Sequence, residues 1–247
     1  MKKHIYSVGF GIFLLILWQG LAVLINASYI LPSPISVLAH LLENLPELMT
    51  VHFPTTMGVV FLGSLISVLL GVLFAILMTM SPMLEKTIYP LLTISQTIPT
   101  MCLAPIFVLW LGYTTRMRVV LVVIMSFFSI TVNVFDGFSA VKKESMELLK
   151  TYGANRWQQF YLLQIPTALP YFFTSLKVTI PWSVVAAAVA EWFGSQSGLG
   201  NYSRVRMMSL DAAGLLAPLV IVSITALIIT GIIKLIERKI VTWGDEL

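Results

Sequence analysis

Charged residues are scarce in this sequence. Only 11% of its 247 residues are Asp, Glu, Lys or Arg, and 58% are hydrophobic. Soluble domains carry about 25% charged residues, so this composition excludes a water-soluble globular protein. The formal net charge of +4 is small, and it gives no reason to expect a nucleic-acid partner.

Cysteine is nearly absent as well. The single Cys102 excludes a disulfide framework and a cysteine-rich metal site. Because it lies within an apolar run, we expect its thiol to be buried and unreactive.

Motifs of catalysis are also missing. The sequence contains no H-E-x-x-H pair, no G-x-S-x-G elbow and no Gly-rich Lys-Ser/Thr loop for nucleotide phosphates. Its histidines (His4, His40 and His52) lie near the ends of apolar runs or in loops. We therefore expect no enzyme, no bound metal and no cofactor of its own, and any energy for work must come from another subunit.

Long apolar runs dominate what is present. A helix needs about 20 residues to cross about 30 Å of hydrocarbon, and the sequence predicts an all-α integral membrane protein with about six transmembrane helices in a single domain, residues 1–247. The first run resembles a signal sequence but is too long for one, so we expect it to be retained. The expected spans are 8–27, 54–80, 87–112, 117–138, 168–194 and 212–236.

The basic residues predict the orientation of these spans. With the N-terminus inside the cell, cytoplasmic segments carry ten Lys and Arg residues, whereas outer segments carry four. This bias follows the positive-inside rule and places both termini in the cytoplasm. The four outer residues are Arg116, Arg118, Arg204 and Arg206.

The third expected span, 87–112, is interrupted by Pro90, Pro99 and Pro105. Backbone groups that proline leaves unpaired must find partners in protein or in a water-lined cavity. The span therefore either lines a solute pathway or is a kinked structural helix. Candidate pathway residues are Gln96, Thr97 and Thr100 here, with Asn133 and Ser183 in later spans.

A polar segment, residues 142–166, separates the fourth and fifth spans. Glu144–Tyr152 contains good helix formers, Gly153 permits the left-handed turn that ends a helix, and Asn155 can cap the next one. We call this segment the coupling hairpin. Its apolar side chains suit a groove on a partner protein, or they pack against the ends of the protein's own helices.

The coupling hairpin resembles the cytoplasmic signature of bacterial ABC importer permeases, Glu-Ala-Ala, three residues, Gly, nine residues, Ile-x-Leu-Pro. Here Glu147, Leu148 and Leu149 occupy the first positions, Gly153 follows, and Leu163–Pro166 ends the pattern. The alanines are leucines in this chain. Three further stretches, LPSP at 31–34, residues 90–112 and AEWFGSQSGLG at 190–200, resemble the nitrate, sulfonate and taurine branch.

This resemblance implies the type I ABC importer (MetI-like) permease fold in a bacterial plasma membrane. It also implies a second permease subunit, expected to be an identical copy, two cytoplasmic ATPases that bind ATP and Mg²⁺, and an extracytoplasmic binding protein. The imported solute would be a sulfonate, nitrate or thiamine-pyrimidine precursor. The alternative is a stand-alone secondary transporter or channel. Expected ATPase contacts are Glu147, Leu148, Leu149, Gly153, Ala154, Asn155 and Arg156.

Glu191 is an ionisable residue within an expected span, which is a functional hypothesis by default. Lys177 is 14 residues away, about 21 Å along a helix, so the two cannot pair. Glu191 and Trp192 either belong to an outer gate or binding-protein contact, or Glu191 forms a structural ion pair with Arg204 or Arg206.

Overall fold

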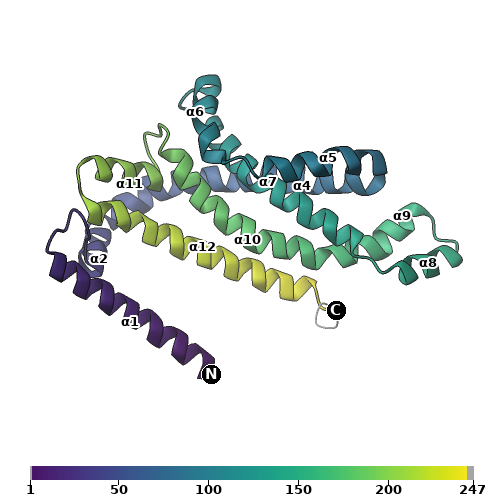
Figure 1. The fold of residues 1–247 in the computed structure, drawn as a ribbon, viewed down its shortest axis with the longest axis horizontal. Helices are drawn as coiled ribbons and strands as arrows, with labels where there is room; N and C mark the ends of the chain where they lie inside the picture. Colours follow the sequence, from purple (N-terminus) through teal and green to yellow (C-terminus); the bar gives the residue numbers. More distant parts are fainter. Residues whose placement is uncertain (1, 244–247) are drawn as a thin grey trace.

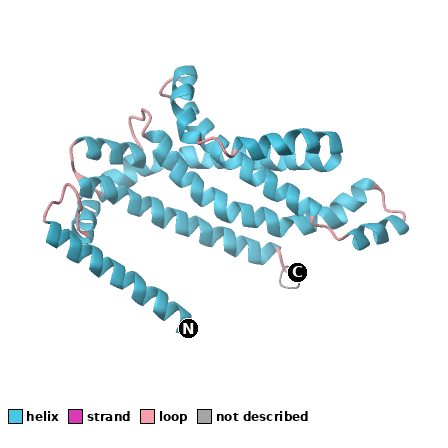
Figure 2. Cartoon of the chain, in the orientation of Figure 1, coloured by secondary structure: helices cyan, strands magenta, loops and turns pink. Residues whose placement is uncertain are grey.

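The structure, a computed structural model, describes the backbone of residues 2–243 and their side chains except those of residues 2–5, 7, 100 and 101. Every regular element in this part of the chain is helical (Figures 1 and 2), which confirms the all-α prediction. The elements are α1 (Lys2–Ile25), α2 (Pro34–Glu43), α3 (Leu45–Glu47), η1 (Leu48–His52), α4 (Phe53–Met80), α5 (Pro82–Ser95), α6 (Thr100–Leu111), α7 (Thr115–Ser139), α8 (Lys143–Thr151), α9 (Arg156–Gln159), η2 (Phe160–Gln164), α10 (Ile165–Glu191), α11 (Leu199–Met208) and α12 (Ala212–Ile240).

Five helical stretches are long and apolar enough to cross a membrane. Each falls within or above the roughly 17–25 residues that the hydrocarbon layer requires. Their many exposed Leu, Ile and Val side chains suit a lipid environment, where helices satisfy their own backbone groups. These stretches are Val8–Ile25, Leu45–Met80, Thr115–Ser139, Arg156–Glu191 and Ala212–Ile240.

The expected span 87–112 is interrupted, as its prolines indicate, but at only one of them. The chain forms two shorter helices there, α5 with 14 residues and α6 with 12, and neither alone reaches the roughly 20 residues of a span. The break falls at Pro99, the N-cap of α6, because proline lacks a backbone donor and disfavours helix at the residue before it. Pro90 and Pro105 remain inside helices. Cys102, expected to be buried, is exposed near this break.

Two glycines of α4 show the direction of its neighbour α7. A Cβ on Gly63 would lie 2.5 Å from Val122 Cγ1, and one on Gly71 would lie 2.7 Å from Ile130 Cγ2. From the first contact to the second, the residue number rises by eight in both helices, so α4 and α7 run parallel. They touch closely through small residues, as packed membrane helices do. The chain must therefore return along the length of α4 before α7 begins, and α5 with α6 makes that return.

Helix α10 packs against both α4 and α7 and forms the centre of the bundle. Its direction opposes that of α4, because Ser183 Oγ lies 2.8 Å from Ser64 Oγ and Glu191 lies beside Thr56. Near the middle of α10, Lys177 Nζ donates to Glu237 Oε1 of α12 at 2.8 Å. Helix α1 stands apart from this bundle in Figure 1, tied to the segment before α2 by the Trp18 indole, which donates to Pro32 O at 3.0 Å.

Candidate functional site

The coupling hairpin consists of α8, a tight turn, and α9 with η2. Gly153 adopts φ +78° at the turn, the left-handed conformation that glycine enters without steric cost. Asn155 then caps α9, because its side chain accepts from Gln158 N at 2.9 Å and its own N–H donates to Gln158 Oε1 at 2.8 Å. This reciprocal cap closes the start of the second helix. The local structure agrees with the turn and cap that the sequence predicts.

The hairpin has one covered face and one open face. Phe160 is buried and lies 5.2 Å from the ring of Phe138 in α7, which anchors the hairpin to the bundle. On the other side, large apolar side chains have no cover from the part of the chain that the structure describes. Their exposed fractions are 58% for Leu148, 81% for Tyr152 and 71% for Tyr161.

The other predicted contact residues lie along the same hairpin. Glu147 and Leu148 are on α8 and exposed, whereas Leu149 is half-buried. Ala154 N donates to Leu149 O at 3.0 Å across the turn. Helices α8 and α9 project beyond the ends of the long helices (Figure 1). The fold therefore holds these residues together at one end of the molecule.

A second cluster forms at the opposite end, around Glu191. The Glu191 carboxylate is fully buried and accepts hydrogen bonds from Thr56 Oγ1 and Gly200 N, both at 2.8 Å. Leu199 N donates to Thr56 Oγ1 at 2.9 Å, and Gly198 N donates to His52 Nδ1 at 3.0 Å. We call His52, Thr56, Glu191 and Gly198–Gly200 the Glu191 cluster; it joins η1, α4 and α10 to the start of α11.

Two glycines make the close approach in this cluster possible. A Cβ on Gly200 would lie 1.8 Å from Ala188 O, and one on Gly198, with φ +117°, would lie 2.2 Å from Glu191 Cδ. Neither position can accept a side chain without moving the backbone around it. The Gly-Leu-Gly sequence is therefore required for the loop to pass over α10.

The ion pair expected between Glu191 and Arg204 or Arg206 is wrong. Arg206 Nη1 lies 3.8 Å from Asp211 Oδ2, and Arg204 Nη2 donates to Asn201 Oδ1 at 3.0 Å. The basic residue near the cluster is instead Arg118, whose Nη1 donates to Ser195 Oγ at 2.6 Å. The start of α11 meets the carboxylate with a backbone group instead, because Gly200 N donates to Glu191 Oε2.

Sequence reasoning missed His52, Thr56 and Arg118 as partners in this region. Each is a single polar residue at the end of an apolar helix, and no spacing links it to Glu191, which is 135 positions from Thr56. The antiparallel contact of α4 with α10 brings Thr56 to Glu191. Arg118 reaches this region separately, from α7, through Ser195. The partial signal was that Glu191 itself needs a buried partner.

The predicted pathway residues do not form one site. Gln96 and Thr97 are exposed at the break between α5 and α6, and Thr100 has no described side chain. Asn133 Nδ2 donates to Ser129 O at 2.7 Å within α7, and Ser183 is fully buried against α4. Trp192 is 38% exposed. A pathway role for these residues stays a prediction.

Curated proteins resemble the chain over nearly its whole length. It is 39% identical to the formylaminopyrimidine transport permease protein ThiX of Halalkalibacterium halodurans, covering 96% of this chain and 95% of that protein. It is 32% identical to the riboflavin transport system permease protein RibX of Chloroflexus aurantiacus (93% and 87% covered). The taurine transport system permease protein TauC of Escherichia coli is 24% identical (97% and 90% covered), which confirms the expected branch.

Solved structures share the fold. An inward-facing methionine ABC transporter, MetNI, matches with a TM-score of 0.61 at 20% identity, covering 75% of this chain and 91% of that one. An amino acid ABC transporter matches with a TM-score of 0.68 at 16% identity, covering 81% and 96%. Residues 67–242 match the family described as binding-protein-dependent transport system inner membrane component. The chain therefore belongs to this family, and it is a multi-pass permease component of an ABC importer.

Proposed function

We propose that this chain couples the import of a small solute to a separate ATPase through its coupling hairpin. The observation that carries the proposal is the open apolar face of the hairpin, with Leu148, Tyr152 and Tyr161 all more than half exposed. A short amphipathic helix with such a face suits a hydrophobic groove on a partner. No nucleotide-binding loop occurs in the chain itself.

The expected assembly has two copies of this chain, two ATPases at the coupling hairpins and a binding protein on the opposite side. ATP and Mg²⁺ would bind only to the ATPases. Lys142, Lys143, Lys150 and Arg156 on the hairpin favour its cytoplasmic placement by the positive-inside rule, and both termini follow to the same side. The Glu191 cluster then faces the exterior.

Coupling in this assembly requires a rigid link. A ligand shifts a two-state equilibrium only by its differential affinity for the two states, so motion of the ATPases must reach the membrane helices without loss. The Phe160–Phe138 contact and the reciprocal cap at Asn155 give the hairpin that rigidity. Closure of the ATPases around ATP would draw the two hairpins together and open the pathway outward.

The solute is proposed to be a small nitrogen heteroaromatic compound. This proposal follows two relatives that are 39% and 32% identical to the chain, whose names state transport of formylaminopyrimidine and riboflavin. A taurine-like sulfonate is the second class, because the taurine permease is more distantly similar. Thermal-shift screening of the partner binding protein against formylaminopyrimidine, riboflavin and taurine separates the classes: a shift with the pyrimidine alone supports the first proposal.

The experiment that tests the coupling role is co-purification. A tagged chain expressed with its own ATPase and binding protein should retain the ATPase through detergent extraction, and uptake in vesicles should require ATP. A chain with Leu148 changed to Ser should retain less ATPase, since a buried leucine contributes about 1.5–3 kcal/mol. Uptake without the ATPase would instead indicate a stand-alone secondary transporter or channel.

A further inference from the structure

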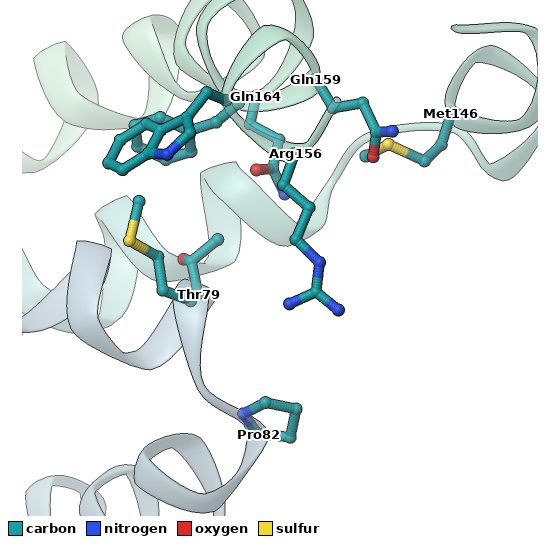
Figure 3. Close-up of a pocket in the computed structure, with 9 residues that line it drawn as sticks. Thr79, Pro82, Met146, Arg156, Gln159 and Gln164 are labelled. Carbon is teal, nitrogen blue, oxygen red and sulfur yellow. The ribbon is translucent and has the colours of Figure 1, made fainter. Parts of the chain in front are cut away.

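A cavity lies between the coupling hairpin and the turn that joins α4 to α5 (Figure 3). Its volume is about 450 Å³, within the roughly 300–1,000 Å³ of small-molecule sites. Thr79 and Pro82 line it from the α4–α5 turn, and Arg156, Gln159 and Gln164 line it from the hairpin. We call it the Arg156 cavity.

The cavity has an uncompensated positive charge. Arg156 contributes a guanidinium, Gln159 and Gln164 contribute amides, and no Asp or Glu is among the lining residues. Within residues 2–243, Arg156 forms none of the ion pairs that the structure contains. Figure 3 shows its side chain extending from α9 toward the turn that carries Thr79 and Pro82. Gln159 Nε2 already donates to Ala154 O at 2.7 Å, so the guanidinium is the principal donor, and a guanidinium suits a phosphate.

The remaining lining is apolar. Met80, Trp157 and Phe160 contribute to the walls, and Trp157 is 69% exposed. Tryptophan is enriched at the level of lipid headgroups because its ring is apolar and its N–H is polar. A ligand that fills this cavity therefore needs a phosphate at one end and apolar groups at the other.

The position of the cavity matches the headgroup layer. Helix α4 ends the spanning stretch Leu45–Met80, which has 36 residues, about 54 Å at 1.5 Å per residue. This is longer than the roughly 30 Å of hydrocarbon, so the end of α4 lies outside the hydrocarbon. The last residue of α4, Met80, borders the cavity. Figure 1 shows the end of α4, the start of α5 and α9 at the same end of the bundle.

We infer that the Arg156 cavity binds the headgroup phosphate of an anionic phospholipid from the leaflet on the hairpin side. The glycerol and upper acyl chains contact Met80 and Trp157, and Arg156 holds the phosphate. The lipid thereby fastens the coupling hairpin to the membrane beside the α4–α5 turn. The assignment to the inner leaflet rests on the cytoplasmic orientation of the proposed function; the lipid site itself does not require an ATPase.

The test uses the purified full-length chain alone, so that loss of ATPase docking cannot affect it. Native mass spectrometry with added phosphatidylglycerol or phosphatidylcholine should show stronger retention of phosphatidylglycerol. Arg156→Gln should weaken that retention about tenfold, since a hydrogen bond to a charged group contributes roughly 1.5–3 kcal/mol. Lys150→Gln is the matched control, because it removes the same charge from an exposed position outside the cavity, and it should change retention less than twofold.

A second measurement is independent of any change at Arg156. Phosphatidylglycerol with brominated acyl chains should quench more fluorescence in the wild-type chain than in Trp157→Phe, and brominated phosphatidylcholine should not show this difference. Equal loss in Arg156→Gln and Lys150→Gln would overturn the site in favour of diffuse basic attraction. Displacement of the lipid by millimolar glycerol phosphate would overturn it in favour of a soluble phosphate ligand.

Discussion

A Gly153→Val variant should insert into the membrane normally but lose most of its ATPase. Gly153 has φ +78° and a Cβ there would meet no atom within 4 Å, so the penalty comes from the backbone alone. A non-glycine residue in the left-handed region costs roughly 1–2 kcal/mol, and a β-branched residue is a genuine outlier there. We expect ATPase affinity and ATP-driven uptake to fall about tenfold or more.

The matched control for this prediction is Gly153→Asn. Asparagine tolerates the left-handed conformation, and the open space around the position accepts its side chain, so the variant should keep most of the uptake. Expression level, membrane insertion and ATPase retained per permease are measured for both variants. Normal uptake by Gly153→Val would show that the turn does not transmit coupling.

A Glu191→Gln variant should lower the thermal stability of the purified chain. Both carboxylate oxygens accept hydrogen bonds, one from Thr56 Oγ1 and one from Gly200 N. An amide can accept at only one of these positions. Its NH₂ can donate one hydrogen to Thr56 Oγ1, whose hydroxyl then turns to His52 O, but the second N–H adds a further donor to this buried site. An unsatisfied buried donor costs about 1–3 kcal/mol, which corresponds to a fall of roughly 4–8 °C in Tm for about 2 kcal/mol.

Two measurements separate a structural role for Glu191 from a role in gating. Glu43→Gln makes the same chemical change at an exposed residue and should leave Tm within about 1 °C, since surface changes are usually within ±0.5 kcal/mol. A fall in both Tm and uptake for Glu191→Gln indicates that the cluster holds α11 in place. Unchanged Tm with lost uptake would assign Glu191 to the gate, and no change in either would remove it from both roles.

The sequence alone predicted elements whose signals are local. Long apolar runs predicted the spanning helices, and Gly153 with Asn155 predicted the turn and cap of the coupling hairpin, because one residue determines each feature. The sequence did not indicate which of the three prolines breaks the helix, since membrane helices tolerate proline inside them and both Pro90 and Pro105 do remain in helices. Which of the prolines interrupts the helix depends on what packs around it.

The partners of Glu191 could not be predicted for a different reason. Thr56 and Glu191 meet only because α4 and α10 are antiparallel neighbours, and apolar runs carry little information about which helices touch. Small residues gave a partial guide. Small residues such as Gly63 and Gly71 allow a close helix neighbour, but they do not specify that the neighbour is α7, as the contacts with Val122 and Ile130 show.

The break between α5 and α6 has a thermodynamic consequence for the purified chain. Gln96, Thr97 and Ile98 form exposed, non-helical backbone in the described structure, and lipid does not tolerate such backbone within the hydrocarbon. In the proposed assembly a second copy or a water-filled pathway covers it. Association would then contribute to folding stability by mass action, so the melting temperature of the chain should rise with its own concentration in detergent.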